Sequence, residues 1–298
     1  MPCNNSYTAL WKTVSLIKIF KGIRYHGIVE QEHQRKETEL SLESKVAIAK
    51  IIIKEALQKY YRPIVVWSGG KDSTVVLDLV RKVSIELNMK MPPSLFIDHG
   101  DHYKETLDII ESVSNSWNFK VITARNDDVI SHIRNNMISI SELSAENQEQ
   151  ARRIGFTNGE FEYSLNTIVG NHLLKTCAMN NAIINYRFDA LFTGVRWDEN
   201  FSRSQEVFIS VRDYPPHVRV QPILTFTERE IWNYMFKYNL PIHPLYSQGY
   251  RSIDGVHDSN KVSDIPAWEQ DLEKTKERAG RSQDKEGVME NLRRFGYM

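Results

Sequence analysis

The segment that decides the fold lies between Ile64 and Ser73 and reads Ile-Val-Val-Trp-Ser-Gly-Gly-Lys-Asp-Ser. Its first four residues are apolar, which is typical of a short strand buried on both faces of a sheet. After the two glycines, apolar residues recur at helical spacing from Val75 to Val83. The segment therefore predicts a buried strand, a tight turn and the start of a helix, in that order.

The turn carries the residue types of a phosphate-binding loop. Two successive glycines let the backbone approach a phosphate, and the following helix offers unpaired amide groups and the positive end of its dipole. The loop is not a Walker A loop, because Asp72 follows Lys71 where that motif has serine or threonine. An ordinary turn with a solvated lysine is the alternative, but the flanking strand and helix favour the phosphate site. The residues predicted to bind nucleotide are Ser68, Gly69, Gly70, Lys71, Asp72 and Ser73.

Strand and helix patterns alternate around this loop. The other predicted strands cover residues 95–98, 119–123 and 190–193, and the predicted helices cover 41–60, 103–117 and 165–186. Such alternation indicates an α/β fold with a doubly wound parallel sheet. Ligands of these sheets bind beyond the carboxyl ends of the strands, so we expect the loops after Trp67, Asp98 and Thr193 to meet at one site.

Composition divides the chain into three predicted parts. Residues 1–40 form an N-terminal helical extension and linker, residues 41–240 form the nucleotide-binding α/β domain, and residues 241–298 form a C-terminal extension over the site. Lysine plus arginine equals aspartate plus glutamate at 38 each, so no nucleic acid or anionic membrane is expected as a partner.

The cysteine content and the hydrophobic runs bear on the compartment. Only Cys3 and Cys177 are present, which leaves no disulfide framework and no zinc-binding cysteine pair. No stretch after the predicted N-terminal helix approaches the roughly 20 consecutive apolar residues that span a bilayer. We therefore expect a cytoplasmic protein.

The loop Ser-Gly-Gly-Lys-Asp-Ser resembles the pyrophosphate-binding loop of the ATP pyrophosphatase (PP-loop) superfamily. Residues 45–298 resemble its phosphoadenosine phosphosulfate reductase branch, which implies an adenine nucleotide alpha hydrolase-like fold. The branch includes the sulfonucleotide reductases, the sulfate adenylyltransferase small subunit and the FMN adenylyltransferases. The loop alone does not separate these members.

The reductases use a cysteine near the C-terminus to attack sulfur. The comparable region here, Gly249–Asp258, contains no cysteine. Cys177 lies inside a helical pattern, where a packed thiol is expected rather than a catalyst. Reductase chemistry of the usual kind is therefore not expected.

Three segments resemble the sulfate adenylyltransferase small subunit. They are Leu174-Lys175-Thr176, the loop Gly194–Glu199 followed by Ser202-Arg203, and the C-terminal stretch from Glu277 to Tyr297. Two features depart from that pattern. Gly69 stands where the subunit usually has another residue, and Gly249–Ile253 looks like a segment of the reductases and the FMN adenylyltransferases.

The resemblance implies roles for particular residues. The predicted catalytic residues are Lys71, Asp72, Lys175 and Arg196. Besides the loop, the predicted nucleotide-binding residues are Asp98, Gly194, Arg203, Arg278 and Arg281. A planar bidentate donor suits phosphate, although a solvated position is the default for any isolated arginine. For the segment Asp98–His102 we favour nucleotide contact over a metal site, since no further ligand group with metal spacing is evident.

The implied activity is transfer of AMP from ATP to sulfate, which yields adenosine 5'-phosphosulfate and pyrophosphate in sulfate assimilation. Such a reaction needs positioning and charge neutralisation rather than a protein nucleophile. Magnesium would bridge phosphate oxygens, and a separate GTPase subunit or a homo-oligomer is the implied partner. Three alternatives stay open: AMP transfer to FMN, reductase chemistry with a displaced cysteine, and a non-catalytic ATP-binding component of a modification complex.

Overall fold

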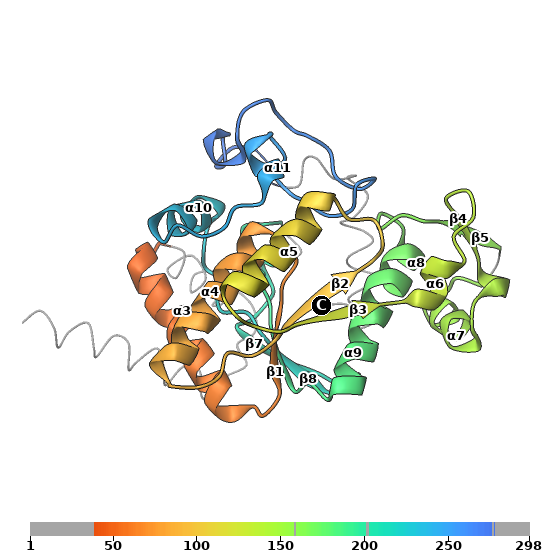
Figure 1. Cartoon of the computed structure of the whole chain (residues 1–298), viewed down its shortest axis with the longest axis horizontal. Helices are drawn as coiled ribbons and strands as arrows, with labels where there is room; N and C mark the ends of the chain where they lie inside the picture. The colour runs from red at the N-terminus through yellow and green to blue at the C-terminus, as the bar shows by residue number, and fades with distance from the viewer. Residues whose placement is uncertain (1–38, 158, 201–202, 276, 278–298) are drawn as a thin grey trace, which may run out of the picture. The chain divides into compact units, whose positions relative to one another are not determined.

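The computed structural model describes residues 39–157, 159–200, 203–275 and 277. Their central feature is a six-stranded sheet with the strand order β3-β2-β1-β6-β8-β7 (Figure 1). Neighbouring strands are parallel except for β7 and β8, which are antiparallel. The strands are β1 (Pro63–Val66), β2 (Ser94–Asp98), β3 (Val121–Arg125), β6 (Ala190–Phe192), β7 (Ile209–Arg212) and β8 (His217–Val220).

The strand order reverses between β1 and β6, and this confirms the predicted doubly wound sheet. The chain leaves β1 toward β2 and β3 on one side, and it leaves β6 toward β8 and β7 on the other. A ligand crevice is expected beyond the carboxyl ends of the strands at such a switch point. The loops after β1 and β6 therefore border the expected site.

The antiparallel edge is a feature that the sequence analysis did not predict. β7 alternates exposed and half-buried residues at the edge, and its partner β8 includes His217 and Arg219. Neither strand is a continuous apolar run, so the pattern that revealed the central strands is missing from both. An edge strand of a parallel sheet is often antiparallel.

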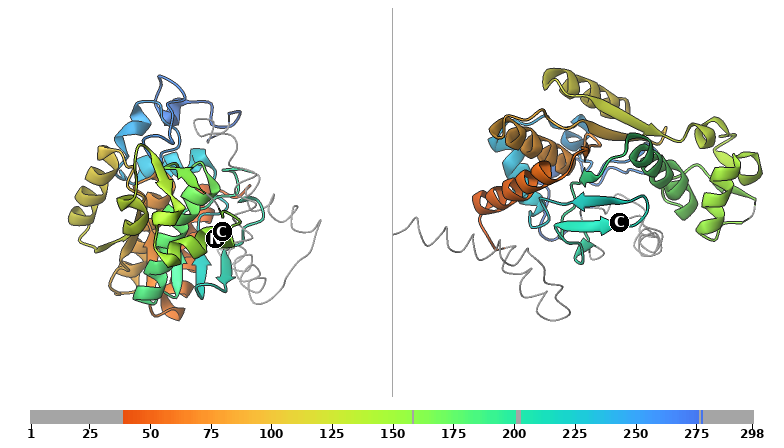
Figure 2. Two further views of the ribbon diagram at one scale, coloured as in Figure 1. Left: turned by 90° about the vertical axis from the view of Figure 1, so that its right-hand side faces the viewer. Right: turned by 90° about the horizontal axis from the view of Figure 1, so that it is seen from below.

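Helices cover both faces of the sheet (Figure 2). One face packs on α3 (Leu42–Lys59), α4 (Lys71–Glu86), α5 (Lys104–Ser116) and α10 (Glu228–Lys237), and the other face packs on α9 (Ala178–Tyr186). β1 shows the alternation directly, because Val65 joins the core with α3 and α4 whereas Ile64 joins the core with α9. Such burial on both faces is why β1 reads as an apolar run.

A small lobe is inserted between β3 and α9. It contains α6 (Asp127–Ser131), β4 (Met137–Ser139), α7 (Ala145–Arg153), β5 (Glu160–Glu162) and α8 (Ile168–Asn171). β4 and β5 pair antiparallel. The lobe packs around its own apolar cluster, which includes Ile138, Phe161 and Leu173.

The helix predicted over 165–186 is interrupted. A π-helical turn, η2 (His172–Cys177), joins α8 to α9 and carries Lys175. Such turns are rare and are frequent at functional sites. Cys177 ends the turn with its thiol buried, and burial raises the pKa of this thiol to about 12. The thiol is thus packed and protonated at neutral pH, in agreement with the sequence prediction.

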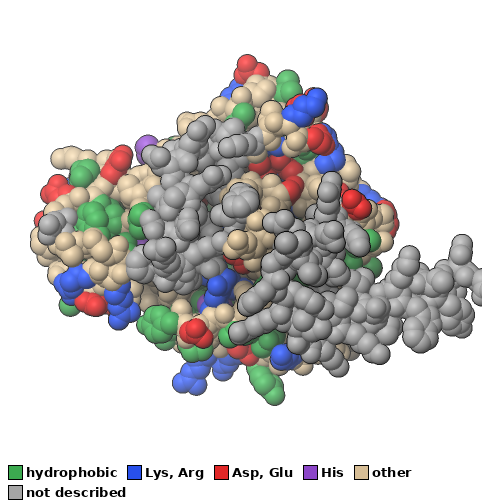
Figure 3. All heavy atoms as spheres, turned by 180° about the vertical axis from the view of Figure 1, so that it is seen from behind, with side chains coloured by type: hydrophobic (Ala, Val, Ile, Leu, Met, Phe, Trp, Pro, Cys, Tyr) green, Lys and Arg blue, Asp and Glu red, His purple; other side chains and the backbone are tan. Residues whose placement is uncertain are grey.

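Within the described residues, no helix combines the length and apolar character that crossing a membrane requires. Charges of both signs are interspersed over the face shown in Figure 3, with no single-sign patch among its described side chains. This distribution agrees with the balanced charge of the sequence.

The contact between the β6 loop and α4 requires a glycine. A Cβ atom on Gly194 would lie 2.8 Å from the backbone nitrogen of Ser73 and 2.9 Å from the carbonyl carbon of Asp72. Both atoms belong to the first turn of α4, so any side chain at position 194 would push this turn away from the sheet. The position of the glycine turn relative to the β6 loop thus depends on this close approach.

We predict that Gly194→Ala lowers the free energy of unfolding by about 1–3 kcal/mol, the usual cost of overpacking, and speeds amide hydrogen exchange in the first turn of α4. Urea unfolding and hydrogen exchange would measure the two effects. Gly155→Ala is the control, because φ there is +80° and no described atom lies within 4 Å of the added Cβ. It should destabilise through backbone strain and leave exchange in the first turn of α4 unchanged. Equally faster exchange in this turn in both variants would contradict the prediction.

Candidate functional site

The glycine turn lies between β1 and α4, as predicted. Gly69 has φ +77°, a conformation that residues with a side chain rarely adopt, and Gly70 is the N-cap of α4. The Ser73 hydroxyl donates to the carbonyl of Gly70 at 3.0 Å, which closes the first turn. The Lys71 amide donates to the hydroxyl of Tyr246 at 3.1 Å. The amide end of a sixteen-residue helix therefore faces this site.

Lys71 is buried, and its ammonium group is surrounded by carboxylates. Its Nζ lies 2.5 Å from Glu277 Oε1, 3.4 Å from Asp72 Oδ2 and 3.8 Å from Glu228 Oε1. Burial lowers the pKa of Lys71, but these carboxylates outweigh burial and hold it well above its ordinary value. Lys71 is therefore a fixed positive charge at neutral pH.

Arg196 follows β6 and is fully buried. Its Nη2 pairs with Glu277, and its Nε lies 3.1 Å from Asp72 Oδ1 and 3.4 Å from Asp198 Oδ1. Its Nη1 has no hydrogen-bond partner within the described part of the chain. A buried guanidinium group with an unused donor is suited to an anion that carries several oxygen atoms.

The site contains more carboxylates than cations. Around Lys71, Arg196 and Arg251 lie Asp72, Asp198, Glu199, Glu228 and Glu277. Burial raises the pKa of Asp72 to about 6, although Arg196 and Lys71 oppose the shift. Burial also raises the pKa of Asp198 to about 6, against the opposing effect of Arg196. Both carboxyl groups therefore titrate close to neutral pH.

The structure adds Tyr246, Arg251 and Glu228 to the site, besides the carboxylates Asp198, Glu199 and Glu277, and the sequence analysis assigned none of these six residues to it. Tyr246 places its ring 5.6 Å from Lys71 Nζ, as measured to the ring centroid. Arg251 accepts a hydrogen bond from Lys71 Nζ at its carbonyl oxygen, 3.3 Å away, and its guanidinium pairs with Glu228 at 2.8 Å. Glu228 begins α10 beside the Thr227–Glu230 capping box. In the sequence, Glu228 is visible only as part of a helix start, and Arg251 only as part of the segment Gly-Tyr-Arg-Ser. Neither pattern indicates that the residue contacts Lys71.

The other predicted residues lie in different surroundings. The carboxylate of Asp98 is 2.5 Å from Arg125 Nη1 and 3.4 Å from His102 Nε2. Lys175 pairs with Asp254, and Arg203 lies 3.5 Å from Glu199. Arg278 and Arg281 lie outside the described residues.

The segment after β2 contacts the C-terminal part of the chain. His99 is buried, and its Nε2 lies 3.8 Å from Asp254 Oδ1, the partner of Lys175. Burial, assisted by the charge of Lys175, lowers the pKa of His99 to about 2, so its ring is neutral. Among the described residues, no set of three or more His, Cys, Asp or Glu side chains is placed to hold a metal ion.

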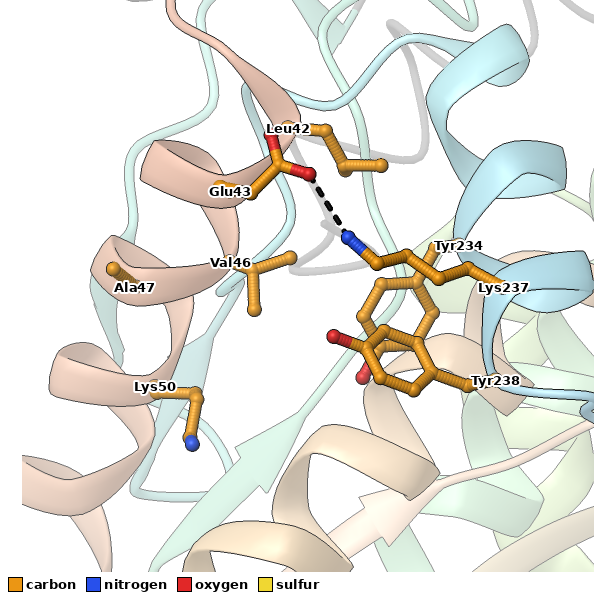
Figure 4. A pocket seen from close by; sticks show the side chains of 8 residues that line it. All are labelled: Leu42, Glu43, Val46, Ala47, Lys50, Tyr234, Lys237 and Tyr238. Atoms are coloured by element: carbon orange, nitrogen blue, oxygen red, sulfur yellow. Dashed lines mark hydrogen bonds and ion pairs between the residues drawn. The ribbon is translucent and has the colours of Figure 1, made fainter.

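A surface hollow of about 290 Å³ lies elsewhere, between α3 and the end of α10 (Figure 4). Its lining residues are Leu42, Glu43, Val46, Ala47, Lys50, Tyr234, Lys237 and Tyr238. None of the predicted site residues is among them. At the site itself, the Glu277 carboxylate occupies the space between Lys71 and Arg196.

Fold and site together define an α/β protein with a doubly wound sheet and two buried cations, Lys71 and Arg196, at its switch point. The model of the phosphoadenosine phosphosulfate reductase domain family matches residues 62–261, and the chain belongs to this family.

Curated relatives include two proteins named sulfate adenylyltransferase subunit 2. The one from Shewanella frigidimarina is 29% identical over 227 residues, which are 68% of this chain and 66% of the relative. The one from Brucella anthropi is 26% identical over 225 residues, 68% of this chain and 65% of the relative. The chain thus matches slightly less than two thirds of the length of these relatives.

Two solved structures share the fold. Candida glabrata FMN adenylyltransferase has a TM-score of 0.57 and 17% identity, and the match covers 84% of this chain and 94% of that chain. Phosphoadenylyl-sulfate reductase from Candida auris has a TM-score of 0.50 and 18% identity, with 81% of this chain and 100% of that chain covered.

We predict that sulfate binds the metal-free protein about tenfold more tightly near pH 5 than near pH 8, because the protonated carboxyl groups no longer repel the anion. Below about pH 6 the Asp72 and Asp198 carboxyls are protonated, which removes negative charge that opposes the anion. Calorimetric titration in EDTA would measure the affinity. Asp198→Asn should reduce the pH dependence. Affinity that stays constant or falls as the pH drops through 6 would contradict the prediction.

Proposed function

We propose that this chain is an adenylyltransferase that transfers AMP from ATP to sulfate, forming adenosine 5'-phosphosulfate and pyrophosphate. The observation that carries the proposal is the pair of buried cations, Lys71 and Arg196, at the amide end of α4. This arrangement is suited to several phosphate groups. The relatives named sulfate adenylyltransferase subunit 2 support sulfate as the acceptor.

The proposed chemistry needs no protein nucleophile. A sulfate oxygen attacks the α-phosphorus of ATP, the bond from the α-phosphorus to the bridging oxygen breaks, and its electron pair leaves with pyrophosphate. Lys71 and the first amides of α4 would hold the leaving pyrophosphate. Arg196, whose Nη1 is unbonded within the described residues, would neutralise the charge that develops. Asp72 and Asp198 would orient the guanidinium group through their contacts with its Nε.

Two of the carboxylates fit a magnesium ion. Magnesium is usually held by one or two carboxylates together with phosphate oxygens and water. Asp72 and Asp198 would hold it, because their Oδ1 atoms lie 3.1 and 3.4 Å from the same atom, Arg196 Nε. Bound magnesium would supply charge neutralisation to the phosphates. It would also offset the carboxylate excess that opposes an added anion.

The predicted partner follows from the names of the relatives. "Subunit 2" denotes one component of an assembly in those proteins. We propose that this chain works with a separate GTPase subunit, because forming a phosphosulfate from ATP and sulfate is uphill and needs a coupled reaction. A homo-oligomer is the alternative assembly.

FMN is the second candidate acceptor. The fold resemblance to the Candida glabrata FMN adenylyltransferase supports it, and one structure of that protein contains FMN and an ATP analogue. A flavin acceptor predicts flavin binding, whereas sulfate does not. A binding-only protein predicts ATP binding without pyrophosphate release.

The function is tested by incubating the protein with magnesium and α-labelled ATP in three reactions, which contain sulfate, FMN or no acceptor. Added pyrophosphatase removes the pyrophosphate product and so draws the uphill reaction forward. We expect sulfate-dependent adenosine 5'-phosphosulfate, reduced at least about a hundredfold in Lys71→Ala, in line with removal of one charge-stabilising group. Lys54→Ala, an exposed lysine on α3, is the matched control and should retain activity. A flavin product would establish the second candidate, and ATP binding without any product would refute transfer by the isolated chain.

A separate variant tests the reductase alternative. Cys177→Ser should retain AMP transfer, because the thiol is buried and its pKa is raised to about 12. A thiol-specific reagent should label Cys177 slowly in the native protein and quickly in urea, as measured by mass spectrometry of the Cys3→Ser background. Rapid native labelling together with loss of activity in Cys177→Ser would favour cysteine chemistry.

A further inference from the structure

The space between the two buried cations is occupied by a side chain from the C-terminal part of the protein. Glu277 Oε1 lies 2.5 Å from Lys71 Nζ, and Glu277 Oε2 pairs with Arg196 Nη2. The glutamate is itself buried. One carboxylate therefore bridges two cations, Lys71 at the start of α4 and Arg196 in the loop after β6.

A carboxylate in this position has the charge and part of the geometry of a phosphate group. Both anions accept hydrogen bonds through oxygen atoms that match a lysine and a guanidinium group. The carboxylate has only two oxygens, and Arg196 Nη1 is left without a hydrogen-bond partner among the described residues. An anion with more oxygen atoms could use this remaining donor.

The segment before Glu277 is anchored beside the site. Arg251 donates to the hydroxyl of Thr275 and, at 3.1 Å, to the carbonyl of Leu272. Arg229 holds Glu273 with two hydrogen bonds of 3.0 and 3.1 Å. The glutamate is thus delivered two residues beyond a fixed point, which gives it a high effective concentration at the cations.

The geometry points to Glu277 as an intramolecular competitor for the phosphate groups of the ligand. A phosphate that takes Lys71 Nζ and Arg196 Nη2 must displace the carboxylate from both atoms. Retaining Glu277 beside the phosphate would add another negative charge to a site that already has excess carboxylates. The Glu277 side chain therefore leaves these two atoms when the ligand binds. This inference rests on the part of the proposed function that places phosphate at these cations, and not on the identity of the acceptor.

The competition sets the affinity of the site. Binding of any anion at these atoms first breaks the Glu277 contacts, which costs free energy. A ligand with several phosphates makes more new contacts than a single weak anion, so it offsets this cost more easily. In the absence of nucleotide, the carboxylate also supplies the nearest counter-charge to Lys71 Nζ and Arg196 Nη2, both of which are buried. Glu277 thereby links stability without ligand to selectivity.

The test uses the full chain with inorganic pyrophosphate as the probe. Glu277→Gln keeps the shape of the side chain and removes its charge, so calorimetric titration should show binding tighter by about tenfold to a hundredfold, the usual range for a charged hydrogen-bonded contact. Glu269→Gln is the matched control, because Glu269 is an exposed carboxylate on the same segment. Glu269→Gln makes the same change in net charge as Glu277→Gln, and it should leave the affinity for pyrophosphate within about twofold of the wild-type value. Equal or weaker binding in Glu277→Gln would overturn the inference.

A second measurement covers a variant that folds less stably. Sulfate should raise the melting temperature of Glu277→Gln more than that of the wild-type protein, because the anion fills the position that the carboxylate has left. Trypsin should cut after Lys274, which is exposed, faster in the wild-type protein when pyrophosphate is present. In Glu277→Gln the cut should already be fast without ligand. A smaller sulfate effect in the variant, or cleavage unaffected by pyrophosphate, would count against displacement.

The outcomes separate this inference from the proposed function. Tighter pyrophosphate binding in Glu277→Gln without AMP transfer to sulfate or FMN would support the competition and refute the transferase. Sulfate-dependent transfer with unchanged pyrophosphate affinity in Glu277→Gln would support the transferase and refute the competition.

Discussion

The structure of the site depends on two positive charges that are buried side by side. Lys71 lies just beyond the carboxyl end of β1, and Arg196 lies just beyond that of β6. These two strands are neighbours at the point where the strand order of the sheet reverses. A buried charge is costly unless it is paired, so each cation must find counter-charge within reach. That counter-charge comes from the start of α10, from the loop after β6 and from Glu277. One electrostatic requirement thus ties together segments that lie far apart in the sequence.

The same requirement bears on the proposed binding of phosphate. A lysine and an arginine that are already desolvated and held in place need little reorganisation when an anion arrives, and this is the condition for strong electrostatic stabilisation. The excess of carboxylates has the opposite effect, since it disfavours an added anion until protons or a metal ion compensate. Asp72 and Asp198, whose pKa values burial raises to about 6, are the groups on which this balance depends.

Local patterns in the sequence were sufficient for the central strands and for the helices that flank them. β1 and the start of α4 were predictable because a strand buried on both faces and an amphipathic helix each leave a clear pattern. β7 and β8 were not, because a short edge hairpin with polar residues leaves none. The sequence analysis also missed the π turn η2. A single π turn adds only one residue to an α-helical turn, so it hardly changes the spacing of apolar residues along the helix.

The sequence by itself determined the glycine turn between a buried strand and a helix, because this feature follows from residues adjacent in the chain. It also placed Lys71 and Arg196 among the predicted site residues, and the structure brings both to Glu277. Only the tertiary structure decided the partners. Glu277 is more than two hundred positions from Lys71 along the chain, and Asp98 and Lys175 turned out to pair with Arg125 and Asp254. Such pairings depend on how the strands and the C-terminal segment pack together, and no local pattern records them.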